Sequence, residues 1–158
     1  LIGYMGAGKT TLGKAFARAM GLTFVDLDWY IEERFHKTVR QIFTERGEDG
    51  FRELEKRMLH EAGEFEDVVI MEYMNQAGET VFLDVNTKVL FRRLKVAKQQ
   101  RPLLANKNDE ELMAFIQEAL QKRLPYYTKA KHVFNGERLE DRHQIQQSVE
   151  RLKELLEL

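Results

Sequence analysis

The stretch GYMGAGKTT, residues 3–11, decides the fold of this chain. Gly3, Gly8, Lys9 and Thr10 match the phosphate-binding pattern G-x-x-x-x-G-K-[ST]. Glycines adopt backbone angles that turn successive N–H groups toward an anion, and they let a phosphate approach without meeting a Cβ atom. The Lys9 ammonium is expected to contact the β- and γ-phosphates, and the Thr10 hydroxyl to bind the Mg²⁺ that bridges them. The stretch therefore predicts a site for a nucleoside triphosphate, ATP or GTP.

An amphipathic helix is expected directly after this loop. Its apolar residues recur at helical spacing and stop at Gly21; they are Leu12, Ala15, Phe16, Ala19 and Met20. The N-terminus of such a helix carries a positive partial charge that favours a bound anion. This context favours a nucleotide site over a chance glycine-rich turn.

The rest of the chain alternates predicted strands with predicted helices. The expected strands are LTFVDLD (22–28), DVVI (67–70), ETVFLDV (79–85) and HVFN (132–135). The expected helices cover 31–35, 39–43, 51–65, 87–98 and 108–124, with Asn108 or Asp109 as the N-cap of the last, and a closing helix contains Ile145 to Leu156. This alternation predicts a single α/β domain over residues 1–158, a parallel sheet with helices on both faces.

Composition excludes several other classes. The chain is 43% hydrophobic and 32% charged with a formal net charge of -1, so no global field attracts nucleic acid or anionic lipid. It has no cysteine, which excludes disulfides and thiolate metal sites. No apolar run approaches the roughly 18 residues of a membrane span, and no signal peptide is visible. We therefore expect a cytoplasmic monomer that binds neither nucleic acid nor membrane.

Two carboxylates, Asp26 and Asp28, end the strand expected at 22–28. Ligands of an open α/β sheet bind beyond the carboxyl ends of its strands, so both side chains are expected to face the phosphates. Two residues apart on a strand, they would share one face. Such a pair can hold Mg²⁺ through water and can orient or deprotonate a hydroxyl nucleophile. The alternative is a helix N-cap beside a solvated acid.

A charged hinge is predicted at Arg101. It opens RPLL (101–104), and the polar, turn-rich ANKND (105–109) follows. A charge at a break followed by a polar cover is typical of a mobile lid. We expect this lid to cover about residues 101–110.

Five segments, in order and over essentially the whole chain, resemble shikimate kinases. They are GYMGAGKTT (3–11), FVDLDWYIE (24–32), IFTERGEDGFRELE (42–55), RPLL (101–104) and RLPYYTKA (123–130), and together they are far more specific than the phosphate loop alone. The resemblance implies a nucleoside-monophosphate-kinase-like P-loop fold with three layers. It also implies that the γ-phosphoryl of ATP passes to the 3-hydroxyl of shikimate, on the pathway to chorismate and the aromatic amino acids. ATP, Mg²⁺ and shikimate are then the small molecules that the chain binds.

The resemblance further implies a role for each site residue. The catalytic residues are Lys9, Asp28 as candidate base, and Arg101 as the lid arginine beside the transferring phosphate. Thr10 binds the metal directly and Asp26 binds it through water. The ATP phosphates contact Gly6, Ala7, Gly8, Lys9, Thr10, Thr11 and Arg101, and Arg93 stacks on adenine; shikimate contacts Asp28, Arg52, Arg123, Phe43 and Phe51, the two arginines at its carboxylate.

The chain departs from the family pattern after DVVI. The family has three glycines there that bind substrate and γ-phosphate, whereas MEYMNQAGE follows directly in this sequence. A strand-to-helix connection usually needs about two to six residues. Only Leu1 and Ile2 precede Gly3, although a strand normally has about five or six residues. We expect that residues are missing before residue 1 and between 70 and 71; a real deletion is the alternative.

Two other functions are also compatible with the sequence. One is a related small-molecule kinase, for gluconate or a nucleoside monophosphate. The other is a non-catalytic nucleotide-binding module, which the absence of the glycine segment favours.

Overall fold

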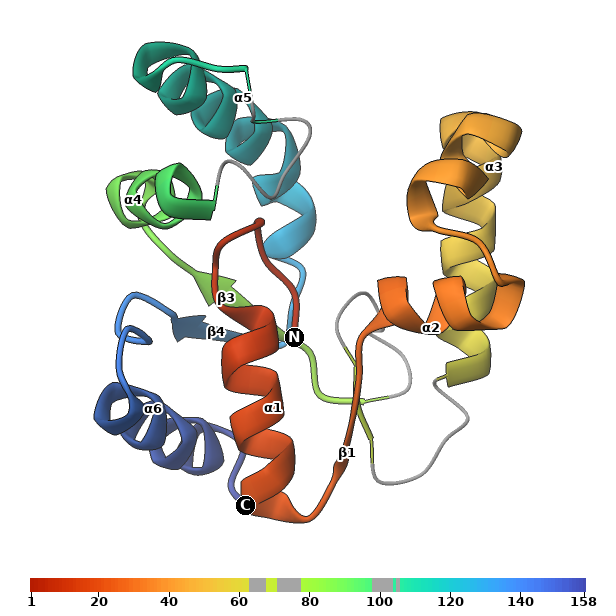
Figure 1. The fold of residues 1–158 in the computed structure, drawn as a ribbon. Helices are drawn as coiled ribbons and strands as arrows, with labels where there is room; N and C mark the ends of the chain where they lie inside the picture. Colours follow the sequence, from red (N-terminus) through yellow and green to blue (C-terminus); the bar gives the residue numbers. More distant parts are fainter. Residues whose placement is uncertain (63–67, 71–77, 98–103, 105) are drawn as a thin grey trace.

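Strands and helices alternate along the chain, as the sequence predicts (Figure 1). The computed structural model describes residues 1–62, 68–70, 78–97, 104 and 106–158. The elements are α1 Lys9–Met20, β1 Thr23–Val25, α2 Leu27–Phe35, α3 Val39–Ala62, β2 Val68–Ile70, β3 Val81–Asp84, α4 Thr87–Ala97, α5 Asp109–Tyr127, β4 His132–Asn135 and α6 Arg142–Leu155.

All strand pairs in the described ranges are parallel. Strand β1 pairs with β2 in the register Thr23 to Val68, and β3 pairs with β4 in the register Val81 to His132. The other edge of β3 pairs with the start of the chain, because the Ile2 N–H donates to the Val81 carbonyl at 2.8 Å and the Ile2 carbonyl accepts from Leu83 N–H at 2.8 Å. This pairing brings the phosphate-binding stretch to the carboxyl end of β3.

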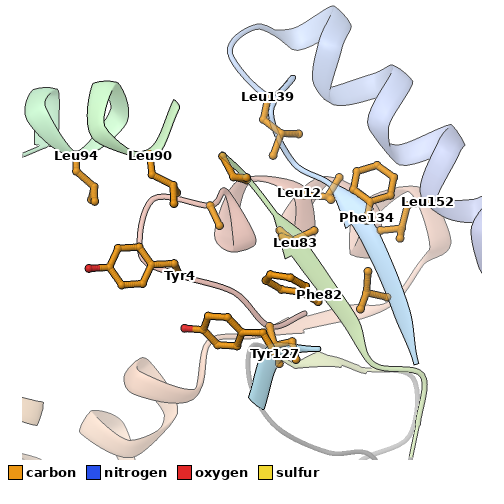
Figure 2. Packing of buried hydrophobic residues seen from close by; sticks show 14 of the residues in the cluster. Tyr4, Leu12, Phe82, Leu83, Leu90, Leu94, Tyr127, Phe134, Leu139 and Leu152 are labelled. Carbon is orange, nitrogen blue, oxygen red and sulfur yellow. The ribbon is translucent and has the colours of Figure 1, made fainter. Parts of the chain in front are cut away.

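Both faces of β3 are covered by helices. Val81, Phe82 and Leu83 are all buried, and successive strand residues point to opposite faces. The main core joins these residues to apolar side chains of α1, α4, α5 and α6, including Leu12, Leu90, Leu94, Tyr127 and Leu152 (Figure 2). The expectation of an α/β fold with helices on both sides of a parallel sheet is confirmed.

Helices α2 and α3 pack against each other around a second, smaller core. Its members are Leu27, Ile31, Ile42, Phe51, Leu54, Met58 and Leu59. Gly47 interrupts α3 with a non-helical φ of 69° and ψ of -177°, so α3 consists of two helical parts that correspond to the two helices expected at 39–43 and 51–65. Helix α2 begins at Leu27, four residues earlier than the apolar pattern predicts, because the Asp26 side chain caps its N-terminus.

The N-terminus of α5 is closed by a reciprocal cap. The Asn108 side-chain oxygen accepts from Glu111 N–H at 2.8 Å, and the Glu111 carboxylate accepts from Asn108 N–H at 2.9 Å. The predicted N-cap is therefore confirmed at Asn108. Both bonds satisfy backbone donors that the first turn of a helix leaves without intrahelical partners.

We expect Asn108→Ala to lower the free energy of unfolding by about 1 kcal/mol, because alanine removes the cap acceptor. Asn108→Gly should lower the free energy of unfolding by only a few tenths of a kcal/mol, since glycine is tolerated at an N-cap. Urea denaturation of the two variants and the parent measures this order. Equal stability of the alanine variant and the parent would contradict the importance of the cap.

Among the described residues, no helix has the length and apolar character needed to cross a membrane.

Candidate nucleotide-binding site

The glycines of the phosphate loop occupy backbone conformations that disfavour other residues. Gly6 has a φ of 79°, and Gly8, the N-cap of α1, has a φ of 98°. A Cβ atom on Gly8 would lie 2.4 Å from Leu139 Cδ1, and one on Gly6 would lie 3.1 Å from Leu94 Cγ. The loop is thus packed between α4 and the segment before α6, with Leu94 and Leu139 on these two elements (Figure 2).

The Lys9 side chain folds back over the loop. Its Nζ donates to the carbonyl oxygens of Gly3 at 2.8 Å and Tyr4 at 3.2 Å. These bonds hold the ammonium over the concave side of the loop, beside the first turn of α1. A cation at a helix N-terminus adds to the positive potential that the free N–H groups already create there.

A cleft of about 630 Å³ opens in front of this loop. It brings together most of the residues that the sequence predicts, from the phosphate loop, α2, α4 and α5. The predicted residues that line it are Gly6, Gly8, Lys9, Thr10, Thr11, Asp26, Asp28, Arg93 and Arg123. Ala7 is buried at the centre of the loop. A concave site with a few converging polar groups is typical of a small-molecule site.

Asp26 and Asp28 reach the cleft from a helix terminus, which corrects the expectation that they end a strand on one face. Strand β1 stops at Val25. Asp26 is the N-cap of α2, and its Oδ1 accepts from Asp28 N–H at 3.1 Å and from Trp29 N–H at 3.4 Å. Asp28 lies in the first turn of α2. An N-cap carboxylate accepts hydrogen bonds from the free N–H groups of the first helical turn, so Asp26 favours the start of a helix at this point over a longer strand.

The two carboxylates still face the phosphate loop, because α2 begins at the cleft. Asp26 and Thr10 both line it, as a water-bridged Mg²⁺ site requires. In the described part of the chain, no group of three or more His, Asp or Glu side chains could hold a metal ion. Mg²⁺ in nucleotide sites is usually bound by one or two protein oxygens, substrate phosphates and water, and Thr10 with Asp26 fits this arrangement.

Arg123 lines the same cleft from the last turns of α5. Its guanidinium carbon lies 5.8 Å from the ring centroid of Tyr4, a buried residue of the phosphate loop. A guanidinium over an aromatic face is attracted to it, which favours the orientation of Arg123 toward the loop. Arginine can bind a carboxylate through two parallel hydrogen bonds.

Two predicted site residues do not line this cleft, and others lie outside the part of the chain that the structure describes. Phe43 and Phe51 lie on α3 with ring centroids 5.5 Å apart; Phe51 is only 4% exposed within the α2–α3 core and Phe43 is 40% exposed. Neither is among the described residues that line the cleft. The side chain of Arg52, the expected lid residues 101–103 and 105, and the junction after Ile70 lie outside the described residues. At the other end of the expected lid, Asp109 and Glu110 lie in the first turn of α5.

Sequence reasoning missed some of the cleft wall. Leu94, Ala97, Leu139 and Glu140 line it, yet none belongs to a motif; Met5 also lines it, from a variable position of the phosphate-binding pattern. Leu94 was detectable only as one position of an apolar helical stripe. Glu140 gave no signal at all, because its role depends on a contact with Arg93, which is 47 positions away in the sequence.

A glycine loop that opens a helix, with a lysine on the loop and a cleft in front of it, defines a P-loop nucleotide-binding protein. The family model described as shikimate kinase matches residues 5–153. The chain therefore belongs to the shikimate kinase family.

Individual relatives agree with this assignment. The shikimate kinase of Phocaeicola vulgatus is 70% identical, over 99% of this chain and 96% of its own length. The crystal structure of the Bacteroides thetaiotaomicron shikimate kinase has 63% identity and a TM-score of 0.94, over 99% of this chain and 98% of its own. The Acinetobacter baumannii shikimate kinase, solved in complex with shikimate, has 28% identity and a TM-score of 0.78, over 99% and 90%.

Proposed function

We propose that this family member transfers the γ-phosphoryl of ATP to the 3-hydroxyl of shikimate, a step in the biosynthesis of aromatic amino acids. The observation that carries the proposal is the shared cleft, where a phosphate loop faces both a carboxylate, Asp28, and an arginine, Arg123. Phosphoryl transfer needs an acceptor alcohol in line with the γ-phosphate and positive charge around it. The cleft offers groups for both ends of such a reaction.

Each polar residue of the cleft has a distinct role in this proposal. Lys9 and the N-terminus of α1 bind the β- and γ-phosphates, and Thr10 with Asp26 would hold Mg²⁺, which lowers the charge repulsion around the transferring group. Asp28 orients the alcohol and accepts its proton. Arg123 binds the carboxylate of the acceptor. This last role is consistent with a relative of the same family having been solved with shikimate bound.

The proposal also includes Arg101 and the side chain of Arg52, which lie outside the part of the chain that the structure describes. Arg101 would add positive charge at the γ-phosphate when the lid closes, and closure would exclude water that otherwise hydrolyses ATP. Arg52 would join Arg123 at the acceptor carboxylate. Phe43 and Phe51 would have to contribute through the position of α3, because they are not on the described wall of the cleft.

We also propose that family members carry a segment that this sequence lacks between residues 70 and 71. The alignment with the Phocaeicola vulgatus relative runs over 168 residues, whereas this chain has 158, so at least ten positions of the relative have no counterpart here. A strand followed at once by a helical pattern is where such a segment would belong. A mass of the intact protein clearly above 18.6 kDa would support an omission from the sequence, and a mass of 18.6 kDa would support a real deletion.

The test of the function is an ADP-release assay on the intact protein with shikimate, with gluconate and with no acceptor. We expect ADP release that depends on shikimate. ADP release only with gluconate would mean that gluconate, and not shikimate, is the acceptor. Nucleotide binding without acceptor-dependent release would favour a non-catalytic module.

A further inference from the structure

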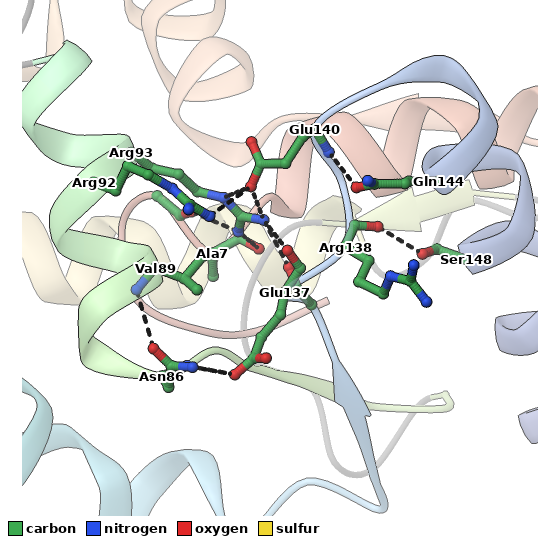
Figure 3. A network of polar contacts seen from close by, with 12 residues as sticks. Ala7, Asn86, Val89, Arg92, Arg93, Glu137, Arg138, Glu140, Gln144 and Ser148 are labelled. Carbon is green, nitrogen blue, oxygen red and sulfur yellow. Dashed lines mark hydrogen bonds and ion pairs between the residues drawn. The ribbon is translucent and has the colours of Figure 1, made fainter.

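The Arg93 side chain joins the two loops that border the cleft (Figure 3). Its Nη1 donates to the carbonyls of Gly6 at 3.2 Å and Ala7 at 3.3 Å. Its Nη2 donates to the carbonyls of Gly136 at 3.0 Å and Glu137 at 2.9 Å. Nε and Nη2 also donate to Glu140 Oε1 at 3.1 and 3.0 Å. All three guanidinium nitrogens are engaged, and the side chain is only 14% exposed.

The segment on the far side of Arg93, residues 136–141, is itself fixed to its surroundings. The Glu137 carboxylate accepts from Asn86 Nδ2 at 2.6 Å, and Asn86 Oδ1 in turn accepts from Val89 N–H in the first turn of α4 at 3.0 Å. The Arg138 carbonyl accepts from the buried Ser148 hydroxyl at 3.0 Å. Glu140 N–H donates to Gln144 Oε1 at 3.1 Å. Arg93 therefore fastens the phosphate loop to a segment that hydrogen bonds hold in place (Figure 3).

The bonds to Gly6 and Ala7 bear directly on the direction of the loop N–H groups. In a planar trans peptide, the carbonyl of one residue and the N–H of the next point in opposite directions. With the Gly6 carbonyl held by Arg93, the Ala7 N–H turns inward, where it donates to the Tyr4 carbonyl at 3.1 Å. With the Ala7 carbonyl held in the same way, the Gly8 N–H is turned to the side of the loop away from Arg93.

We propose that Arg93 is a positioning residue that keeps the phosphate loop in its anion-binding shape through the hydrogen bonds of its guanidinium. The inference rests on the proposed nucleotide site. Loss of this guanidinium would leave four backbone carbonyls and the Glu140 carboxylate without their shared donor. Without several partly buried, charge-assisted hydrogen bonds, the loop would be free to leave its present shape. Because guanidinium N–H groups donate in the plane of the group, these bonds do not prevent its face from stacking on a base.

Tripolyphosphate isolates the positioning role from any contact with the base, because it has the phosphate chain of ATP and no base. We would titrate Mg²⁺-tripolyphosphate and Mg²⁺-ATP into the parent protein and into Arg93→Gln by calorimetry, well below the melting temperature. A positioning role predicts that the variant loses affinity for tripolyphosphate as well as for ATP, by at least about tenfold in each case. A loss confined to ATP, or no loss for either ligand, overturns the inference.

Arg92→Gln is the matched control. Arg92 is the preceding residue of α4, is 67% exposed and approaches the same Glu140 carboxylate at 3.8 Å, without a described bond to either loop backbone. It should change both affinities by less than about twofold, as for an exposed ion pair. An equal loss in Arg92→Gln and Arg93→Gln would mean that net charge, and not the loop contacts, sets the affinity, which contradicts the inference.

Glu140→Gln keeps the test decisive if Arg93→Gln does not fold. It weakens the hold on the guanidinium without removing the donor, and it should weaken both ligands alike by about two- to threefold. Unchanged tripolyphosphate affinity in this variant with weakened ATP binding overturns the inference. If the parent protein binds neither ligand, the proposed function itself fails, which is a different result from a parent that binds and variants that do not differ.

Discussion

Replacement of Lys9 by alanine is expected to lower the turnover of shikimate by at least about a hundredfold, a typical loss for one preorganised electrostatic group. The Lys9 ammonium lies over the phosphate loop, held by the carbonyls of Gly3 and Tyr4. No other described lysine lines the cleft. Without it, charge that develops on the transferring phosphoryl group would lose one of the cations that stabilise it.

The measurement for this variant is steady-state ADP release at saturating shikimate and ATP. Lys14→Ala is the control, because Lys14 is an exposed lysine on the same helix and its Nζ lies 5.7 Å from the Phe24 ring centroid, away from the described cleft wall. The control should keep turnover within about twofold, as a surface substitution usually does. Turnover near that of the parent in Lys9→Ala would reject the proposed role of this lysine.

Asp28→Asn is expected to have an effect of similar size for a different reason. Asparagine keeps the shape of the side chain but cannot accept the alcohol proton, and general acid–base groups contribute about 10²- to 10⁴-fold. We therefore expect turnover to fall at least about a hundredfold with little change in the affinity for ATP, because the phosphate loop is unaltered.

A matched control for Asp28→Asn is Glu33→Gln, on the exposed part of the same helix. It removes one negative charge from α2 and leaves the described cleft wall intact. Full activity in Glu33→Gln together with a large loss in Asp28→Asn would mean that the loss of turnover comes from the place of Asp28 at the cleft and not from the net charge of α2. If Asp28→Asn retained turnover and lost only ATP affinity, Asp28 would belong to the nucleotide side of the cleft.

The phosphate loop could be predicted from sequence because its chemistry is local. Gly8 must adopt a φ of 98° and Lys9 must follow it, and both requirements leave a fixed pattern within nine residues. The cap of α5 was predictable for the same reason, since Asn108 and Glu111 are three residues apart. The alternation of strands and helices then led to the fold.

The carboxylates show where local reasoning was wrong. LTFVDLD has the apolar character of a strand through Asp28, but Asp26 caps α2 and ends the strand at Val25. An aspartate can satisfy helix donors or face a ligand from a strand, and the apolar pattern does not distinguish these cases. The expected outcome, both carboxylates at the cleft, is nevertheless what the structure has.

The rest of the site depends on contacts between distant segments. Arg93 and Glu140 lie 47 positions apart, and nothing in either neighbourhood of the sequence indicates that they meet. The family resemblance carried a role for Phe43 and Phe51 but not their placement: Phe51 is buried in the core between α2 and α3, whereas Phe43 is exposed. Such placements require the packed structure, since hydrogen-bond partners on different elements leave no periodic pattern.

We infer that the phosphate loop and the N-terminus of α1 bind the phosphates of a nucleotide, and calorimetric titration of the intact protein with ATP in the presence of Mg²⁺ measures this binding. We expect a saturable heat of binding to one site per chain, and a large loss of that affinity when magnesium is withheld or Lys9 is replaced. An intact, folded protein that releases or absorbs no heat with ATP and magnesium would show that this site does not bind the nucleotide.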